Sequence, residues 1–109
     1  MSSEASTHNE SPADIRREHQ TFLVSGRIVF ETVVALREQG DRIIDAEPNL
    51  YFDFREVTRT DSSAIVLLLV WLRKAKRAQK PIRFINPPQS MVDMAQAFDV
   101  KSFLSFSAE

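Results

Sequence analysis

Apolar and polar positions along the chain first predict strands. Residues 21–24 are rich in β-branched and aromatic side chains and stop at a Ser-Gly pair, and a weaker strand over residues 15–17 would pair with them as a hairpin. Residues 49–57 alternate between apolar and polar positions, and residues 82–85 form a shorter apolar run. The alternating strand turns three large apolar side chains to one face: Leu50, Phe52 and Phe54.

Three other segments have the helical period. Residues 29–46 carry an apolar stripe, and a proline follows the segment at position 48. Residues 61–79 form the strongest helix, and residues 89–98 form a third. The stripe of the first helix comprises Val29, Val33, Leu36, Gly40, Ile43 and Ile44. A last packing segment after the third helix consists of Val100, Phe103 and Leu104.

The order of these elements predicts the fold class. Strands alternate with helices, which indicates an α/β fold with a small mixed, mainly parallel sheet and helices packed on it. Residues 1–12 are polar and rich in Ser and Glu, and we expect them to be a disordered tail. Residues 13–109 contain no internal linker, so we expect them to form a single domain.

Composition removes most enzyme classes. The chain of 109 residues has no cysteine, two histidines and two glycines, which leaves no zinc or disulfide framework and no glycine-rich phosphate loop. We therefore expect no enzyme activity, no cofactor and no metal. The formal net charge of −1 argues against a nucleic-acid partner. No apolar run approaches the roughly 20 residues that span a bilayer, so we expect a cytoplasmic protein without direct membrane insertion.

The helix over residues 61–79 is apolar on more than one side. Five of its apolar residues fall within one arc that is sufficient to bury it on a sheet: Ile65, Leu68, Leu69, Leu72 and Ala75. Four more lie outside that arc: Val66, Leu67, Val70 and Trp71. This second face indicates a partner-binding surface that includes Val66, Val70 and Trp71, with Trp71 as the anchor. The alternative is that neighbouring helices of the same domain cover it.

The start of that helix carries polar candidates. Asp61, Ser62 and Ser63 are all capping residue types, and helix capping is the simplest interpretation. A phosphate on Ser62 or Ser63 would also be tolerated at a helix N-terminus. Asp53 and Asp61 flank one strand and loop, and we expect both carboxylates to support the turn by hydrogen bonding rather than to form an acid–base pair.

A basic cluster follows the same helix. Its members are Arg73, Lys74, Lys76, Arg77, Lys80 and Arg83. Cations are favourable at a helix C-terminus, so a solvated face is the default interpretation. Binding to an acidic partner surface or to anionic lipid headgroups is the alternative.

Residues 50–65 read LYFDFREVTRTDSSAI, and this segment resembles the signature of the STAS-domain family. In that signature a strand carries an Asp, a loop follows, and an Asp-Ser-Ser or Asp-Thr turn opens a helix. The downstream stretch INPPQSMVDMAQAFDVKSFL is similar to the last strand, proline-bearing turn and final helix of the family. The resemblance covers about residues 15–104. The matching positions are Asp53, Val57, Asp61, Ser62, Ser63, Ala64 and Ile65.

The resemblance implies one of two functions. MlaB-like STAS subunits bind the cytoplasmic ATPase of an Mla-type ABC transporter, which serves phospholipid transport and outer-membrane lipid asymmetry, and Ser62 would then lie in the interface. Anti-sigma-factor antagonists are phosphorylated by an anti-sigma factor kinase, and Ser63 would be the modified residue. Ala64 stands where the antagonists usually carry glycine, which favours the MlaB-like function. We then expect the protein in the cytoplasm, held at the inner membrane through its partner.

Overall fold

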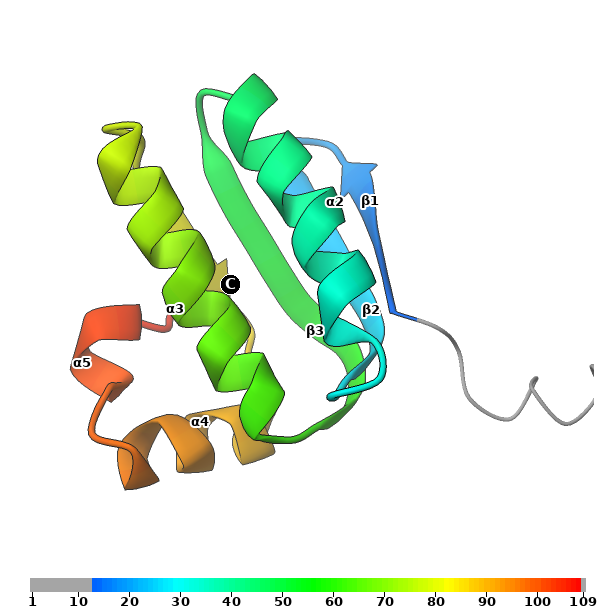
Figure 1. Ribbon diagram of the computed structural model, residues 1–109, viewed down its shortest axis with the longest axis vertical. Coiled ribbons are helices and arrows are strands. Elements are labelled where there is room, and N and C mark those ends of the chain that lie inside the picture. Colours follow the sequence, from blue (N-terminus) through cyan, green and yellow to red (C-terminus); the bar gives the residue numbers. More distant parts are fainter. Residues whose placement is uncertain (1–12, 109) are drawn as a thin grey trace, which may run out of the picture.

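The computed structural model describes residues 13–108, so the expected tail over residues 1–12 lies outside the described residues. Its four strands form one sheet in the order β1-β2-β3-β4 (Figure 1). β1 pairs with β2 antiparallel, whereas β2, β3 and β4 run parallel. The strands are β1 (Asp14–Glu18), β2 (Thr21–Ile28), β3 (Leu50–Thr60) and β4 (Ile82–Ile85). The predicted mixed, mainly parallel sheet is confirmed.

Two long helices cover one face of this sheet. They are α2 (Val33–Ala46) and α3 (Ser62–Arg77), and they lie side by side in Figure 1. Two shorter helices, α4 (Gln89–Ala97) and α5 (Lys101–Leu104), lie next to α3. After α5 the chain returns to the edge of the sheet, where Ser107 forms an isolated parallel bridge with Ile85.

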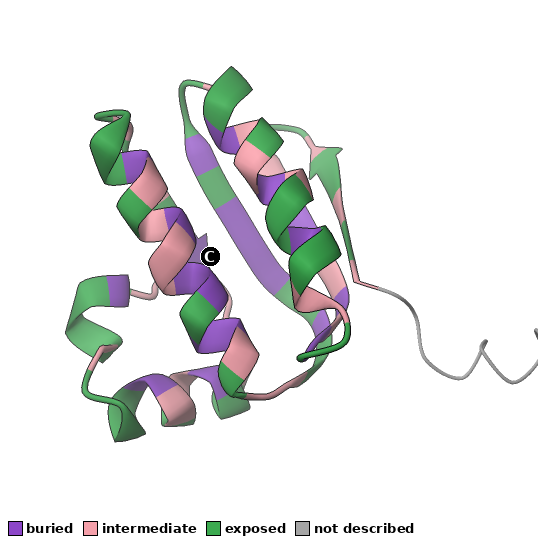
Figure 2. Ribbon diagram, in the orientation of Figure 1, coloured by how far each residue is buried: buried purple, intermediate pink, exposed green. Residues whose placement is uncertain are grey.

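The core fills the space between the sheet and the two long helices. Figure 2 shows buried positions along the sides of α2 and α3 that face the sheet and exposed positions on their outer sides. The three side chains predicted on one face of the 49–57 strand, Leu50, Phe52 and Phe54, are all buried. Their burial removes large apolar surfaces from water, which is the main stabilising contribution in a domain of this size.

The close approach of α2 to α3 depends on one glycine. Trp71 of α3 is fully buried and stacks on Phe52 of β3, with ring centroids 4.9 Å apart and planes 17° apart. The indole also lies directly against Gly40 of α2: a Cβ atom at position 40 would be 2.2 Å from the Cζ2 atom of Trp71. Only a residue without a side chain fits there, because ordinary carbon–carbon contacts begin at about 3.5 Å.

The burial of Trp71 corrects the prediction for α3. The buried residues of α3 are Ala64, Ile65, Leu67, Leu68, Trp71 and Ala75. Three residues of the expected arc, Ile65, Leu68 and Ala75, are therefore buried, whereas Leu69 and Leu72 are only half-buried beside the core. Leu67 and Trp71, which were expected outside that arc, belong to the core. The expectation that Trp71 forms part of an exposed docking face is wrong, because α2 and the sheet bury its ring.

Three boundaries also differ from the sequence prediction. The strand expected over residues 49–57 extends to Thr60. The helix expected over residues 29–46 begins at Val33, because residues 29–32 form a turn in which Thr32 Oγ1 accepts from the Val29 N–H. The strand expected over residues 21–24 continues to Ile28. Gly26 does not end it, because this residue takes a positive φ of 87° at an irregularity in the pairing with β3.

Candidate functional site: the groove between the two long helices

The turn that opens α3 is tied to the turn that precedes α2. Asp61 is the N-cap of α3, and its Oδ1 atom accepts a hydrogen bond from the Ser63 N–H at 2.8 Å. Its Oδ2 atom accepts from the Phe30 N–H at 3.0 Å. One carboxylate thus satisfies an unpaired N–H of the helix and fixes the neighbouring loop. As a result, Phe30 and the first turn of α3 are held next to each other.

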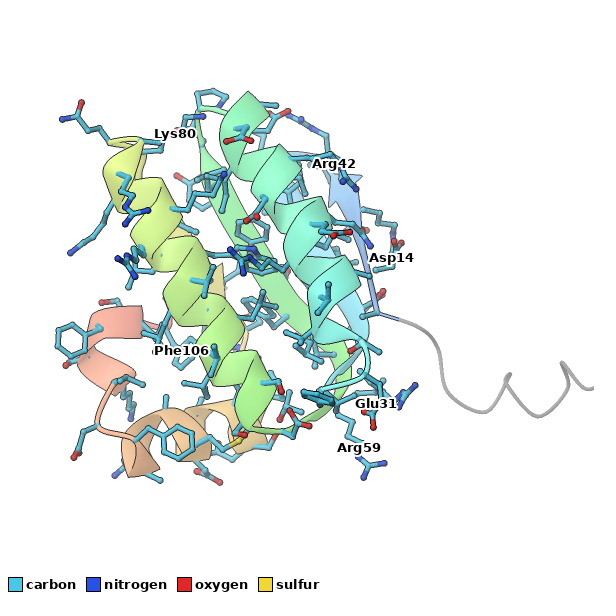
Figure 3. All side chains as sticks on the ribbon, in the orientation of Figure 1. Asp14, Glu31, Arg42, Arg59, Lys80 and Phe106 are labelled. Carbon is cyan, nitrogen blue, oxygen red and sulfur yellow. The ribbon has the colours of Figure 1, made fainter. Side chains whose placement is uncertain are left out.

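These two turns form one end of an apolar groove between α2 and α3, with a volume of about 280 Å³. Its most exposed side chains are Phe30, Val34 and Val66, which are 75%, 66% and 59% exposed. The full lining is Phe30, Val33, Val34, Arg37, Ser62, Ser63, Val66, Leu67 and Val70. In Figure 3 the labelled Glu31 marks the turn before α2, at the end of the molecule where α2 and α3 both begin. Three adjacent exposed apolar side chains are typical of a binding surface rather than of scattered surface residues.

Four of the predicted site residues line this groove. Ser62 is exposed at the first position of α3, Ser63 is half-buried beside it, and Val66 and Val70 follow along the same helix. The structure therefore brings the serine turn and the apolar face together on one surface. Their roles in partner binding, and phosphorylation of Ser63, stay predictions.

Sequence reasoning did not single out Phe30 or Val34, which form the opposite wall of the groove. Both lie outside the stripe that buries α2 on the sheet. The sequence signal for this wall was Phe30, a large aromatic side chain that lies off the apolar stripe and close to the start of the helix. The periodicity from residue 29 onward predicts a continuous helix and so hides this signal, whereas Phe30 lies in a turn.

Asp53 lies apart from the groove. It is 4% exposed, and its Oδ1 atom accepts from the Arg55 N–H at 2.9 Å and from the Asn86 amide at 3.2 Å. The Asp53 carboxylate thus joins β3 to the segment after β4. Among residues 13–108, Asp53 and Asp61 share no hydrogen-bond partner. Over residues 13–108, no group of three acidic or histidine side chains could hold a metal ion.

The groove offers contact surface and hydroxyl groups. Its lining combines apolar side chains with the hydroxyls of Ser62 and Ser63 and the guanidinium of Arg37. It contains no carboxylate or imidazole that could act as a general base. The groove thus has an apolar lining with polar groups beside it. In the part of the chain that the structure describes, no helix is both long and apolar enough to cross a bilayer.

Comparison with known proteins agrees with the fold. The family profile described as "Mlab, STAS domain" matches residues 12–105. No curated protein matches the chain. The structure is similar to the anti-sigma factor antagonist SpoIIAA in its unphosphorylated form, with a TM-score of 0.69, 16% identity, and coverage of 89% of this chain and 87% of SpoIIAA.

Two further structures are similar. An anti-sigma-factor antagonist (STAS) domain protein from Planctomyces limnophilus gives a TM-score of 0.70 at 17% identity, and 91% of each chain is covered. A chain of the Acinetobacter MlaFEDB complex in its ATP-bound conformation gives a TM-score of 0.67 at 28% identity, covering 81% of this chain and 94% of that chain. At 16–17% identity the antagonists establish the fold alone. The profile match, however, spans nearly the whole described domain, and the chain belongs to the STAS-domain family.

Proposed function

We propose that this protein is an MlaB-like subunit that docks through the apolar groove on the cytoplasmic ATPase of an Mla-type ABC transporter. The observation that carries the proposal is the groove itself, in which the exposed Phe30, Val34 and Val66 lie next to the hydroxyl of Ser62. The description of the matching family profile and the likeness to the MlaFEDB complex support this choice of partner.

The groove has the geometry of a protein interface. Its two walls come from different helices, and the Gly40–Trp71 contact and the Asp61 hydrogen bonds set their separation. A partner side chain that enters between Val34 and Val66 would bury apolar surface on both walls. Each fully buried large apolar side chain contributes about 1.5–3 kcal/mol, so a few such contacts suffice for a specific complex.

In this function the protein is a non-catalytic subunit. It would act by stabilising the conformation of the ATPase that it binds best, since a ligand shifts an equilibrium only through its differential affinity for the two states. Its effect on phospholipid transport and outer-membrane lipid asymmetry would follow from that control of ATP hydrolysis. It would lie on the cytoplasmic side of the inner membrane, held there by the transporter.

The second candidate function is that of an anti-sigma-factor antagonist, and Ser63 is the observation that favours it. This residue is in the first turn of α3, where the N-terminal N–H groups favour a negative charge. However, the Ser63 N–H already donates to the Asp61 carboxylate, so a phosphate there would meet a like charge at close range. This contact makes Ser63 a poorer phosphate site than a free helix N-terminus.

Binding assays with both classes of partner test the proposal. The protein should form a stable complex with the transporter ATPase of its own organism and none with an anti-sigma factor kinase. Val66→Ser and Phe30→Ser should weaken the complex with little change in melting temperature. Phe103→Ser is a matched control, because Phe103 of α5 is 64% exposed and lies outside the groove. Binding to the kinase alone, or unchanged ATPase binding by folded groove variants, would reject the proposal.

A further inference from the structure

The groove between α2 and α3 continues beyond its apolar part. A second depression of about 440 Å³ continues between α2 and α3 toward the C-terminal half of α3. Arg37 and Val70 line both depressions, so the two halves form one continuous groove. The second half is lined by Arg37, Asp41, Val70, Arg73, Lys74 and Arg77, and we call it the basic half.

The basic half carries four cations and one carboxylate, and two of the cations have acidic partners within the domain. Arg37 pairs with Asp41 at 3.5 Å, and Lys74 pairs with Asp45 at 3.1 Å. The guanidinium groups of Arg73 and Arg77 make no ion pair or side-chain hydrogen bond with any other residue over positions 13–108. They lie four residues apart on α3, a spacing at which like charges repel and destabilise a helix. Negative charge placed between them would relieve that repulsion.

We propose that the basic half of the groove binds an acidic segment of the same partner protein whose apolar side chains enter the apolar half. This inference rests on the proposed function, because it concerns the polarity of the segment that docks there. The segment would place apolar residues near Ser62 and Phe30, and Asp or Glu residues near Arg73 and Arg77. Arginine suits this role because its guanidinium can bind a carboxylate through two parallel hydrogen bonds.

A protein segment fits these observations better than a lipid surface. The cations line a depression between two helices, into which a narrow chain can enter and a bilayer surface cannot. The basic half is also continuous with an apolar half, so one extended or helical segment can occupy both. The formal net charge of the whole chain is −1, so the protein has no general attraction to anionic membranes. Positive charge is instead concentrated in the basic half of the groove.

Charge reversal tests the proposal in the intact protein. In Arg73→Glu/Arg77→Glu the affinity for the ATPase should fall about tenfold or more at low salt, because two ion pairs with the partner are lost and the reversed charges repel its acidic residues. The difference should shrink at high salt because exposed charges are screened. The matched control is Lys76→Glu/Arg83→Glu, which makes the same change in net charge at exposed positions outside the groove. The control should bind as the wild type does.

Site-directed crosslinking identifies the occupant. The sequence contains no cysteine, so Arg77→Cys and Val66→Cys each introduce a single thiol for a photo-reactive maleimide. Crosslinking to the ATPase followed by mass spectrometry should recover neighbouring stretches of one segment. The stretch captured from position 77 should be acidic, and the stretch captured from position 66 should be apolar. Capture of a neutral or basic stretch from position 77 would overturn the proposal.

The outcomes separate this inference from the proposed function. If the wild type does not bind the ATPase, both fail. If the wild type binds and Val66→Ser weakens binding but Arg73→Glu/Arg77→Glu does not, only the acidic segment is rejected. Binding of the wild type and the charge-reversal variant to vesicles with and without an anionic lipid tests the alternative that the basic half binds lipid. If charge reversal removes vesicle binding and leaves ATPase binding intact, the basic half is a lipid site and the protein segment is rejected.

Discussion

Substitution of Gly40 by alanine should destabilise the domain, although alanine is the better helix former. A Cβ atom at this position would be 2.2, 2.3 and 2.5 Å from Cζ2, Cε2 and Nε1 of Trp71. To reach ordinary contact distances, α2 or the indole must move by more than about 1 Å. The indole has little freedom to move, because it is fully buried and stacked on Phe52.

The magnitude follows from two opposing contributions. Overpacking a core costs about 1–3 kcal/mol of stability. The cost for Gly40→Ala should lie near the upper end of that range, because the new methyl group meets a rigid ring. Alanine in a helix interior is better than glycine by about 1 kcal/mol, which offsets part of that cost. The net loss in the free energy of unfolding should be about 1–2 kcal/mol. For a domain of this size, this lowers the melting temperature by roughly 4–15 °C.

A double-mutant cycle isolates the contact. Trp71→Met replaces the ring with a flexible side chain that can turn away from position 40. In that background Gly40→Ala should be neutral or should stabilise by up to about 1 kcal/mol, because only the helix propensity remains. Urea unfolding of the four proteins measures the cycle. An increase in stability for Gly40→Ala in the wild type, or the same effect in both backgrounds, would refute the argument.

Three further predictions concern the turn and the ends of the helices. Asp61→Ala should lower the free energy of unfolding by about 1–2 kcal/mol in urea titrations, because the N-cap bond to Ser63 and the bond to Phe30 are both lost. Asp61→Asn should recover only part of that loss, because an amide has one accepting oxygen and its NH2 group cannot accept from the second N–H. Ser63→Ala should leave outer-membrane lipid asymmetry in cells nearly intact, whereas complete loss together with phosphate found on Ser63 by mass spectrometry would favour the antagonist function. Lys80→Met should cost about 1 kcal/mol in thermal or urea unfolding, because the Lys80 ammonium donates to the Ile44 and Asp45 carbonyl oxygens at the end of α2 at 2.5 and 3.1 Å, and an unchanged stability would mean that solvent replaces these bonds.

The fold was largely predictable because its signals are local. The alternation over residues 49–57 specifies a strand, and the capping residues before α3 specify the start of a helix. Both depend on interactions between residues close in sequence, and the folded structure keeps both elements. The buried arc of α3 was harder to predict, since every residue from 64 to 72 is apolar and several helical arcs fit equally well. The choice among them depends on Gly40, whose missing side chain admits Trp71 from a distant segment. The sequence pattern of α3 alone does not contain that information.

The candidate site was predictable on one wall only. Ser62, Val66 and Val70 follow from the apolar excess of α3 and its polar start. The opposite wall depends on a long-range hydrogen bond from the Phe30 N–H to Asp61, across 31 positions in the chain. The apolar pattern of α2 alone cannot predict a hydrogen bond to a residue so far along the chain. The basic half illustrates the same point: a solvated face was the default interpretation of its lysines and arginines, and only the structure places Arg73 and Arg77 beside Arg37 in one groove.

Hydrogen–deuterium exchange of the protein, alone and saturated with the transporter ATPase, tests the central claim most directly. The account predicts slower exchange in the complex at residues 30–37 and 62–77, which form the two walls of the groove. It predicts little change at β1 (Asp14–Glu18) and at α5 (Lys101–Leu104), which lie outside the groove. Protection confined to β1 or α5, with the walls of the groove exchanging as in the free protein, would contradict the account.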